Sequence, residues 1–304
     1  MSDAAVSVVI ATRDRPELLR RAVDAVMRQD YPGPVACLVV VDGGPSVELD
    51  EPPADAAGAR TLETIRNSRT PGLAGARNSG AAAASGTYLA FCDDDDEWLP
   101  TKLSAQVAAL ERAGGDVAVT GVRIAYGDAV NDRLPPARVT RGDLLRSRAA
   151  AVHPSTILVR LQAFWDVIGP IDEAIPGSYG EDYEWLLRAA EAGPIVGVRE
   201  PLVTVRWGGS LFADRWETMI DAIGYLIDKH PELLADDANA ARLFGRIAFA
   251  NAALHRRGDA ARWAWRSVRR RPLERRPYLA LAVAAGLVRA STIQQRANAA
   301  GRGV

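Results

Sequence analysis

The sequence predicts an α/β fold in which helices flank a mostly parallel central sheet, followed by a C-terminal α-helical extension. Strand-like apolar segments alternate with helical segments over the first two hundred residues, whereas only helical patterns occur from about residue 213 onward. Strands that alternate with helices are joined by crossover connections, which place neighbouring strands parallel. A chain of 304 residues that is 48% apolar is long enough to bury a substantial core.

The N-terminal part of the chain contains four strand-like segments and two helical ones. The runs 6–11 and 35–41 are apolar and rich in valine, and Pro16 suits the first turn of a helix between them. The glycines of Asp42-Gly43-Gly44 permit a tight turn after the second run. Further along, we expect a strand at 60–65, an alanine-rich helix at 73–84 and a strand at 87–92.

The rest of the chain continues this alternation with longer connections. We expect a helix at 99–113, a strand at 117–122, a loop at 126–139, strands at 195–198 and 202–205, and helices from 213. Between these segments, the acidic pair Glu181-Asp182 opens a helix. The pattern divides the chain into a first domain at 1–210 and a basic helical extension at 211–304.

The most informative stretch is the acidic run Asp93-Asp94-Asp95-Asp96-Glu97, which directly follows the apolar strand at 87–92. Five carboxylates packed this closely repel one another and need a counter-charge. Hard oxygen ligands at the end of a strand suit Mg²⁺ or Mn²⁺, which is typically held by one or two carboxylates and by substrate phosphates. The alternative interpretation is a solvated surface on which the acids cap a helix.

Polar residues stand directly after three of the expected strands, namely Thr12, Asp42 and Asp93. Ligands of parallel sheets bind at the carboxyl ends of the strands, near the point where the strand order reverses. This common placement predicts one shared pocket.

Charge is unevenly distributed along the chain. The formal net charge is −1, but residues 255–304 contain twelve arginines against two acids. Basic helices with tryptophans, as in Arg262-Trp263-Ala264-Trp265-Arg266, can lie on anionic membrane surfaces. Packing on the first domain, or an oligomer interface, is the competing interpretation, and no nucleic-acid recognition motif accompanies the charge.

Composition and targeting signals favour a cytoplasmic protein. Cys37 and Cys92 lie in apolar strand-like runs, where buried reduced thiols are expected. No basic segment followed by an apolar one stands at the N-terminus, and no apolar run reaches the ~18 residues of a spanning helix. We therefore expect a cytoplasmic location. If the basic helices bind the anionic membrane surface, the protein is attached peripherally at the inner face of the plasma membrane.

The chain resembles the family 2 glycosyltransferases, which are inverting, nucleotide-sugar-dependent enzymes of the Rossmann-like GT-A fold. The resemblance covers about residues 5–210 and rests on five segments in family order. They are VSVVIATRDR at 6–15, VVVDGG at 39–44, GLAGARNSG at 72–80, FCDDDDEW at 91–98 and GEDYEW at 180–185.

The resemblance implies a set of donor-binding residues. The turn after the first strand holds the nucleotide in that family, which implies contacts from Thr12, Arg13 and Arg15. Asp42 matches the base-contacting aspartate after the second strand, although Gly43 stands where a second acid is common. Arg77 is implied to pair with the diphosphate, since a guanidinium binds such oxygens well. The alternatives are that Arg13 and Arg15 are solvated surface charges and that Asp42 serves only to form a turn.

The family's DXD motif aligns with Asp93-Asp94-Asp95. The resemblance implies Asp95 as the carboxylate that holds Mg²⁺ or Mn²⁺ and Asp93 as a contact for the ribose or for metal-bound water. Asp94 is implied as a donor-binding residue, or as the direct metal ligand in place of Asp95. Asp96 and Glu97 are expected to cap the helix that begins near residue 99.

Asp182 matches the aspartate of the family's ED motif, the proposed general base. A sugar hydroxyl is a poor nucleophile, so a positioned base must take its proton as it attacks the anomeric carbon. The alternative is that Asp182 only stabilises the dipole of the helix that it opens. Relatives often carry a histidine after the last strand that completes the metal site, but this chain has Val205-Arg206-Trp207-Gly208 there. The candidates for the acceptor side are His153, Glu181, Trp185 and Arg206.

These features predict an inverting glycosyltransferase that moves a sugar from a UDP- or dTDP-sugar to a hydroxyl, in cell-surface glycan or glycolipid synthesis. The expected partners are the donor, a glycan or lipid-linked acceptor, an anionic membrane surface and a second copy of the chain, but no nucleic acid. Two alternatives stay open. A nucleotidyltransferase also uses paired carboxylates and a metal, and a decayed nucleotide-sugar-binding or membrane-scaffold protein would suit Gly43 and the missing histidine.

Overall fold

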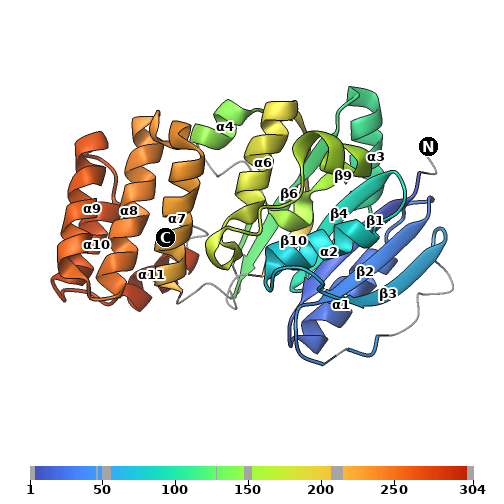
Figure 1. Ribbon diagram of the computed structural model, residues 1–304, viewed down its shortest axis with the longest axis horizontal. Coiled ribbons are helices and arrows are strands. Elements are labelled where there is room, and N and C mark those ends of the chain that lie inside the picture. The colour runs from blue at the N-terminus through green and yellow to red at the C-terminus, as the bar shows by residue number, and fades with distance from the viewer. Residues whose placement is uncertain are drawn as a thin grey trace.

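A mixed sheet with helices on both of its faces forms one part of the molecule, and the C-terminal helices form the end away from β1 to β3 (Figure 1). The computed structural model describes residues 4–45, 47–49, 56–127, 129–146, 153–206 and 215–299. Within these residues, eight strands follow the order β3-β2-β1-β4-β9-β6-β10-β5, with β7 beside β6 and β8 beside β10. The strands are β1 (Val6–Thr12), β2 (Val35–Val41), β3 (Arg60–Arg66), β4 (Tyr88–Asp93), β5 (Asp96–Trp98), β6 (Val117–Tyr126), β7 (Ala129–Arg133), β8 (Arg138–Val139), β9 (Leu158–Arg160) and β10 (Ile195–Arg206).

Helices connect the strands and then make up the whole C-terminal part. They are α1 (Pro16–Met27), α2 (Leu73–Ala83), α3 (Lys102–Ala113), α4 (Arg141–Arg146), α5 (Leu161–Ala163), α6 (Glu181–Ala192), α7 (Trp216–Lys229), α8 (Asp237–Ala253), α9 (Arg257–Arg270), α10 (Arg276–Ala284) and α11 (Ala290–Ala299). Short helical turns η1 (Pro154–Thr156), η2 (Phe164–Ile168), η3 (Pro176–Ser178) and η4 (Pro231–Leu234) lie between them.

The sheet is parallel in its N-terminal part and mixed elsewhere. Strands β3, β2, β1 and β4 are all parallel, as the alternation of strands and helices predicts. The strand β9 then lies antiparallel between β4 and β6, and β5 lies antiparallel to β10. These two strands have three residues each, which is too short to produce a periodic pattern in the sequence.

Several of the expected segments differ from the structure. The helix expected from residue 99 begins at Lys102, and the loop expected at 126–139 contains β7 and β8. The two strands expected at 195–198 and 202–205 are one strand, β10, whose register against β6 shifts on either side of Pro201. Proline has no amide hydrogen for the ladder, so an irregularity at this residue is expected.

Each face of the sheet has its own apolar core, because successive side chains of a strand point to opposite faces. In β1, Val8 and Ile10 belong to the cluster that also includes residues of α1 and α3. Val9 and Ala11 belong to the other cluster, with residues of α2, α6 and α7. The helices therefore hold the strands from both faces of the sheet.

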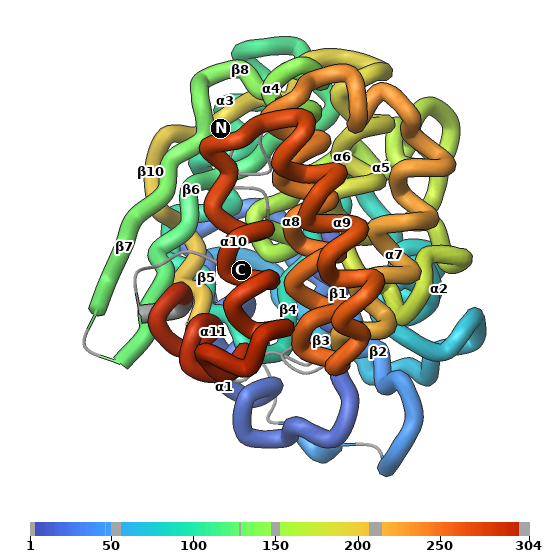
Figure 2. The backbone as a smooth tube through the Cα atoms, turned by 90° about the vertical axis from the view of Figure 1, so that its left-hand side faces the viewer, coloured from blue at the N-terminus to red at the C-terminus, as the bar shows by residue number. Residues whose placement is uncertain are grey.

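The C-terminal helices form two groups. Residues of α7 and α8 belong to the same apolar cluster as α6, so these two helices extend the core of the sheet domain. Beyond them, α9 and α10 pack on α8 through a small cluster made mostly of alanines (Figure 2). None of the helices in the described part of the chain combines the length and hydropathy that crossing a membrane requires.

The close packing of α2 on the sheet makes Gly80 a test of this core. A Cβ atom at Gly80 would lie 2.4 Å from Val9 Cγ1 and 3.0 Å from Val40 Cγ2. We expect Gly80→Ala to lower the free energy of unfolding by about 1–3 kcal/mol, because an overpacked core must shift. Urea denaturation measures this change.

Gly224 in α7 supplies the matched control, since a Cβ added there meets no atom of the described residues within 4 Å apart from the backbone of its own helix and its chain neighbours. Gly224→Ala is expected to raise the free energy of unfolding by up to about 1 kcal/mol through helix propensity alone. An equal effect of both substitutions would contradict the packing described for α2.

Candidate active site

The candidate site lies at the carboxyl ends of β1, β2 and β4. Thr12 is the last residue of β1 and pairs with Val41, the last residue of β2, while Ala11 pairs with Asp93, the last residue of β4. The polar residues that follow these three parallel strands therefore lie along one edge of the sheet, as the sequence predicts.

Two aspartates of the acidic run hold the turn after β1. Thr12 Oγ1 donates to Asp94 Oδ2 at 2.7 Å, and Arg15 Nη1 donates to Asp94 at 3.2 Å and to Asp95 at 3.0 Å. The backbone amide of Arg13 also donates to Asp94, whereas the Arg13 side chain is exposed. The fold thus brings together four of the residues predicted to bind the donor, with Asp95 beside them. The four are Thr12, Arg13, Arg15 and Asp94.

The acidic run retains an unfavourable concentration of negative charge. Burial raises the pKa of Asp95 to about 6, and the neighbouring carboxylates of Asp93, Asp96 and Asp94 add to this effect. Burial also raises the pKa of Asp94, in spite of its bonds to Thr12 and Arg15. A cation that bound at this edge would relieve the repulsion.

Arg77 links the acidic run to the start of α6. Its guanidinium is 2% exposed and donates to Asp93 Oδ1 at 2.5 Å and to Glu181. Burial by itself would lower the pKa of Arg77, but the two carboxylates outweigh it and raise the pKa. The predicted contact between Arg77 and the diphosphate is therefore wrong, because this side chain is enclosed and both carboxylates already pair with it.

The predicted base, Asp182, lies in the first turn of α6 and is 9% exposed. Gly180 precedes the helix with a φ of +86°, a left-handed conformation that glycine adopts without strain. Asp182 is close enough to Arg77 and His153 to influence the pKa of both. The neighbouring Glu181 is enclosed with Arg77, and burial raises its pKa to about 7. Its predicted place on the acceptor side is therefore wrong.

His153 forms a cluster with two aspartates of the run. His153 Nδ1 lies 3.1 Å from Asp96 Oδ2, and Nε2 lies 3.9 Å from Asp93 Oδ2. Burial by itself would lower the pKa of His153, but Asp96, Asp93 and Asp182 raise it to about 9. One ligand atom from each of these residues, Asp93, Asp96 and His153, lies within 4.8 Å of the others.

This donor set fits a divalent cation. Carboxylate oxygens suit both Mg²⁺ and Mn²⁺, and an imidazole among them favours Mn²⁺, since Mg²⁺ prefers oxygen ligands. The sequence did not predict Asp96 as a member of such a cluster. The sequence feature that could have indicated this cluster is His153. It stands 57 residues after Asp96, and only the fold brings the two residues together.

The expected helix-capping role of Asp96 and Glu97 is wrong. Both residues lie in β5, and α3 begins after Thr101 without a side-chain cap. Asp96 is 1% exposed and accepts a hydrogen bond from Ser155, whose oxygen also accepts from the amide of Asp93. Ser155, which the sequence did not single out, thus holds the first and the last of the four aspartates.

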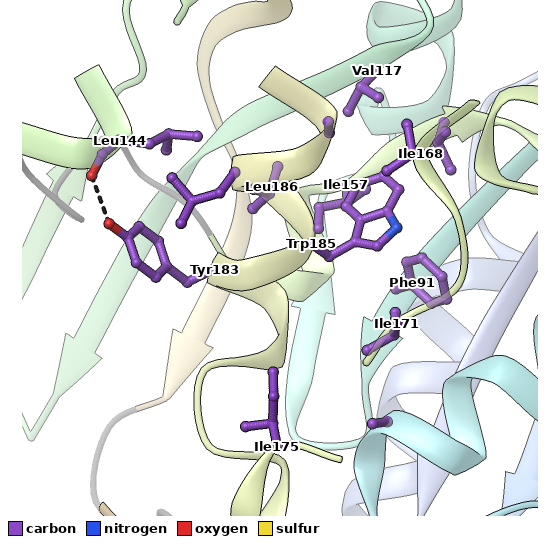
Figure 3. Packing of buried hydrophobic residues seen from close by; sticks show 14 of the residues in the cluster. Phe91, Val117, Leu144, Ile157, Ile168, Ile171, Ile175, Tyr183, Trp185 and Leu186 are labelled. Atoms are coloured by element: carbon purple, nitrogen blue, oxygen red, sulfur yellow. Dashed lines mark hydrogen bonds between the residues drawn. The ribbon is translucent and has the colours of Figure 1, made fainter. Parts of the chain in front are cut away.

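The residues proposed for the acceptor side divide into two groups. Trp185 is 1% exposed, packs among Phe91 and Ile157 in the core, and donates from Nε1 to the carbonyl of Gly169, so it cannot contact an acceptor (Figure 3). Arg206 is half exposed and donates to Glu97 at the end of β10. Residues 207–210, where a family histidine is missing, lie outside the described part of the chain.

Asp42 holds the glycine-rich segment that leads into α2. Its two oxygens accept from Asn67 Nδ2 at 2.7 Å and from the amide of Gly72 at 2.9 Å. Gly43 has a φ of +87°, which explains a glycine where relatives often have an acid. Asn67 is a further residue at this edge that sequence reasoning missed.

Comparison with known proteins agrees with this geometry. Residues 7–168 match the model of glycosyl transferase family 2. The UDP-Glc:alpha-D-GlcNAc-diphosphoundecaprenol beta-1,3-glucosyltransferase WfgD of Escherichia coli is 24% identical over 148 residues, which are 48% of this chain and 57% of that protein. The curated relatives that match first align over only 37–57% of their own length.

Solved structures of glycosyltransferases share the fold. S. aureus TarS 1–349 in complex with UDP-GlcNAc matches with a TM-score of 0.58 at 14% identity, over 98% of this chain and 92% of the TarS 1–349 chain. The mannosyltransferase PcManGT of Pyrobaculum calidifontis, in complex with GDP-Man and Mn²⁺, matches with a TM-score of 0.56 at 15% identity, over 97% and 88% of the two chains. The fold is GT-A. Since the family model covers more than half of the 304 residues, the chain belongs to glycosyl transferase family 2.

Proposed function

We propose that this protein is an inverting glycosyltransferase that moves a sugar from a nucleotide-sugar to an acceptor hydroxyl in cell-surface glycan synthesis. The observation that carries the proposal is the buried link from Asp93 through Arg77 to Glu181, next to Asp182. This link brings the carboxyl end of β4 and the first turn of α6 to one place. A donor at the strand ends and a base on the helix would then share one site.

The donor in this proposal is a UDP- or dTDP-sugar, bound along the turns after β1 and β2. The side chain of Arg13 is exposed and its backbone amide donates to Asp94, so Arg13 can meet a nucleotide that arrives from solvent at this turn. UDP-GlcNAc bound to TarS and GDP-Man bound to PcManGT support a nucleotide-sugar, but they leave the base open.

A divalent cation would be held by Asp93, Asp96 and His153, and Asp95 is a further candidate ligand because it is the most exposed aspartate of the run. When bound, the cation would neutralise the charge that grows on the departing diphosphate. The bound Mn²⁺ of PcManGT supports this choice. The competing interpretation of His153 is a protonated counter-charge for the two aspartates.

Asp182 acts as the general base in the proposed mechanism. Its carboxylate accepts the proton of the acceptor hydroxyl while the oxygen attacks the anomeric carbon. Attack from the side opposite the leaving diphosphate inverts the anomeric centre. Arg77 positions this carboxylate indirectly, because it ties Glu181, the preceding residue of α6, to Asp93.

The acceptor in this proposal is a glycan or a lipid-linked glycan, as the diphosphoundecaprenol acceptor in the name of WfgD suggests. Such acceptors lie at a membrane, so peripheral attachment at the cytoplasmic face is part of the proposal. We also propose residues 1–210 as the catalytic domain and 211–304 as an extension, although α7 and α8 share the core of the first part.

Asp182→Asn tests the assignment of the base. We expect the turnover number to fall by a factor of about 10²–10⁴, because an amide cannot accept the proton. Binding of the donor should change little, since Asp182 does not hold the nucleotide. Release of UDP or dTDP from a panel of nucleotide-sugars measures the rate, and calorimetry measures donor binding.

Asp228→Asn, at an exposed position in α7, is the matched control and should retain full activity. An unchanged rate for Asp182→Asn would remove Asp182 as the base. Pyrophosphate release from a nucleoside triphosphate would instead support nucleotidyl transfer.

Asp96→Asn and His153→Gln test the cation site. If these residues hold the ion, each substitution should weaken Mn²⁺ binding at least tenfold, because a three-ligand protein site loses one donor. Mn²⁺ titration followed by electron paramagnetic resonance measures the affinity with and without UDP.

His255→Gln, at an exposed position outside the site, is the control for the histidine substitution. Equal Mn²⁺ affinity in His153→Gln and in the unmodified protein would favour the counter-charge interpretation of His153 and leave Asp95 as the candidate ligand.

A further inference from the structure

We infer that the outer surface of α10 and its two flanking turns binds the surface of an anionic lipid bilayer. This α10 surface consists of the apolar residues Leu273, Tyr278, Leu279, Leu281 and Leu287 and the basic residues Arg271, Arg275 and Arg289. The inference deepens the proposed peripheral attachment, but it rests on the chemistry of this surface and can fail or hold independently of sugar transfer.

Exposed apolar side chains are concentrated on the α10 surface. Nine large apolar side chains are exposed in the described part of the chain, and five of them lie between residues 273 and 287. Leu273 and Leu287, in the turns at the two ends of α10, are 84% and 82% exposed. Single exposed apolar residues are normal, whereas a contiguous group marks an interaction surface.

The distribution of side chains around α10 is the reverse of that in an ordinary surface helix. A surface helix turns its large apolar residues toward the core and its polar residues toward water. In α10 the small Ala280 is buried against α8 and α9, while Leu279 and Leu281 on either side of it are exposed. The inner contact of α10 is thus made by Ala280, Val283 and Ala284, whereas the larger Leu279 and Leu281 are left exposed.

The charges around α10 are mostly positive, because the one acid of its flanking turns, Glu274, is paired with Arg276. From Arg275 to the end of the chain there are five arginines and no aspartate or glutamate. Among the residues that the structure describes, no carboxylate lies within 4.0 Å of Arg271, Arg275 or Arg289. A group of exposed apolar side chains flanked by arginines without a carboxylate partner matches a bilayer surface, where apolar side chains enter the headgroup region and each arginine gains from anionic lipid.

The place of α10 in the molecule allows such contact. In Figure 1 the helices α9 and α10 form the end of the molecule on the far side of α8 from the sheet, and Figure 2 views this end directly. Strands β1 to β3 lie at the opposite end, so a bilayer against α10 would leave the nucleotide-binding edge accessible. With nine residues, α10 is too short to cross a bilayer and would lie along its surface.

A second copy of the chain is the competing partner, and the charges disfavour it. In a two-fold dimer the same surface meets itself. The arginines around α10 would then face those of the other copy without an intervening carboxylate, which repels. We therefore assign the bilayer as the partner.

Vesicle co-sedimentation of the full-length protein tests the assignment. We expect binding to vesicles of phosphatidylglycerol and phosphatidylcholine, at least tenfold weaker binding to phosphatidylcholine alone, and weaker binding at high salt. The double substitution L281E/L287E should weaken binding to the anionic vesicles at least tenfold. Arg275→Gln and Arg289→Gln should each weaken it about fivefold, the loss expected for one arginine near an anionic surface.

Val167→Glu is the matched control, because Val167 is 59% exposed but lies in η2, away from α10. It should bind vesicles like the unmodified protein. Absence of binding to anionic vesicles, or equal binding by L281E/L287E, would overturn the assignment. So would a dimer in light scattering that the double substitution dissociates, since that result would identify a second copy as the partner.

Discussion

The candidate site depends on one buried cation, the guanidinium of Arg77. The carboxylates of Asp93 and Glu181 come from two elements that the fold brings together, and each would be costly to enclose without a positive partner. Arg77 stands in the middle of α2, between β4 and α6, and pairs with both. Its charge therefore decides how close the acidic run and the acidic turn of α6 can come.

This constraint also orders the rest of the acidic run. Asp93 is neutralised by Arg77, and Arg77 and His153 hold the pKa of Asp93 below its usual value against the effect of burial. Asp94 is held by Thr12 and Arg15, and Asp96 by Ser155 and His153. Asp95 is left as the carboxylate with the least compensation, and its pKa of about 6 reflects this. Four consecutive aspartates thus have four different environments, which their identical side chains conceal in the sequence.

The parts of the fold that were predictable are those with a strong local pattern. The strand β2 is an unbroken apolar run and was predicted with its true bounds, and the helix α6 begins at its acidic pair as expected. The antiparallel strands β9 and β5 were missed because three residues carry no periodicity. Their position depends on contacts with β6 and β10, which lie far away in the sequence.

In the candidate site, too, only the contacts that follow from the alternation of strands and helices were predictable. Thr12 and Asp94 follow strands that pair in parallel, so their proximity could be expected from the alternation of elements alone. The partners of Asp96 could not, because His153 and Ser155 arrive from a segment more than fifty residues away. Trp185 was misplaced for a related reason. Its position after two acids resembles a site residue, but the helical period turns it toward the core, onto Phe164.

The C-terminal helices show why a boundary drawn from secondary structure differs from a boundary of the core. Glu184 of α6 is fully buried and accepts from Arg188 of its own helix and from Lys229 of α7, with His230 nearby. Glu184 stands two residues after Asp182, so α7 braces the turn that carries the proposed base. The outer helices α9 and α10 pack on α8 through a separate apolar cluster, and Trp263 of α9 also meets Phe244 of α8. Of the C-terminal helices, α7 and α8 therefore share the core of the sheet, whereas α9 and α10 pack mainly on α8.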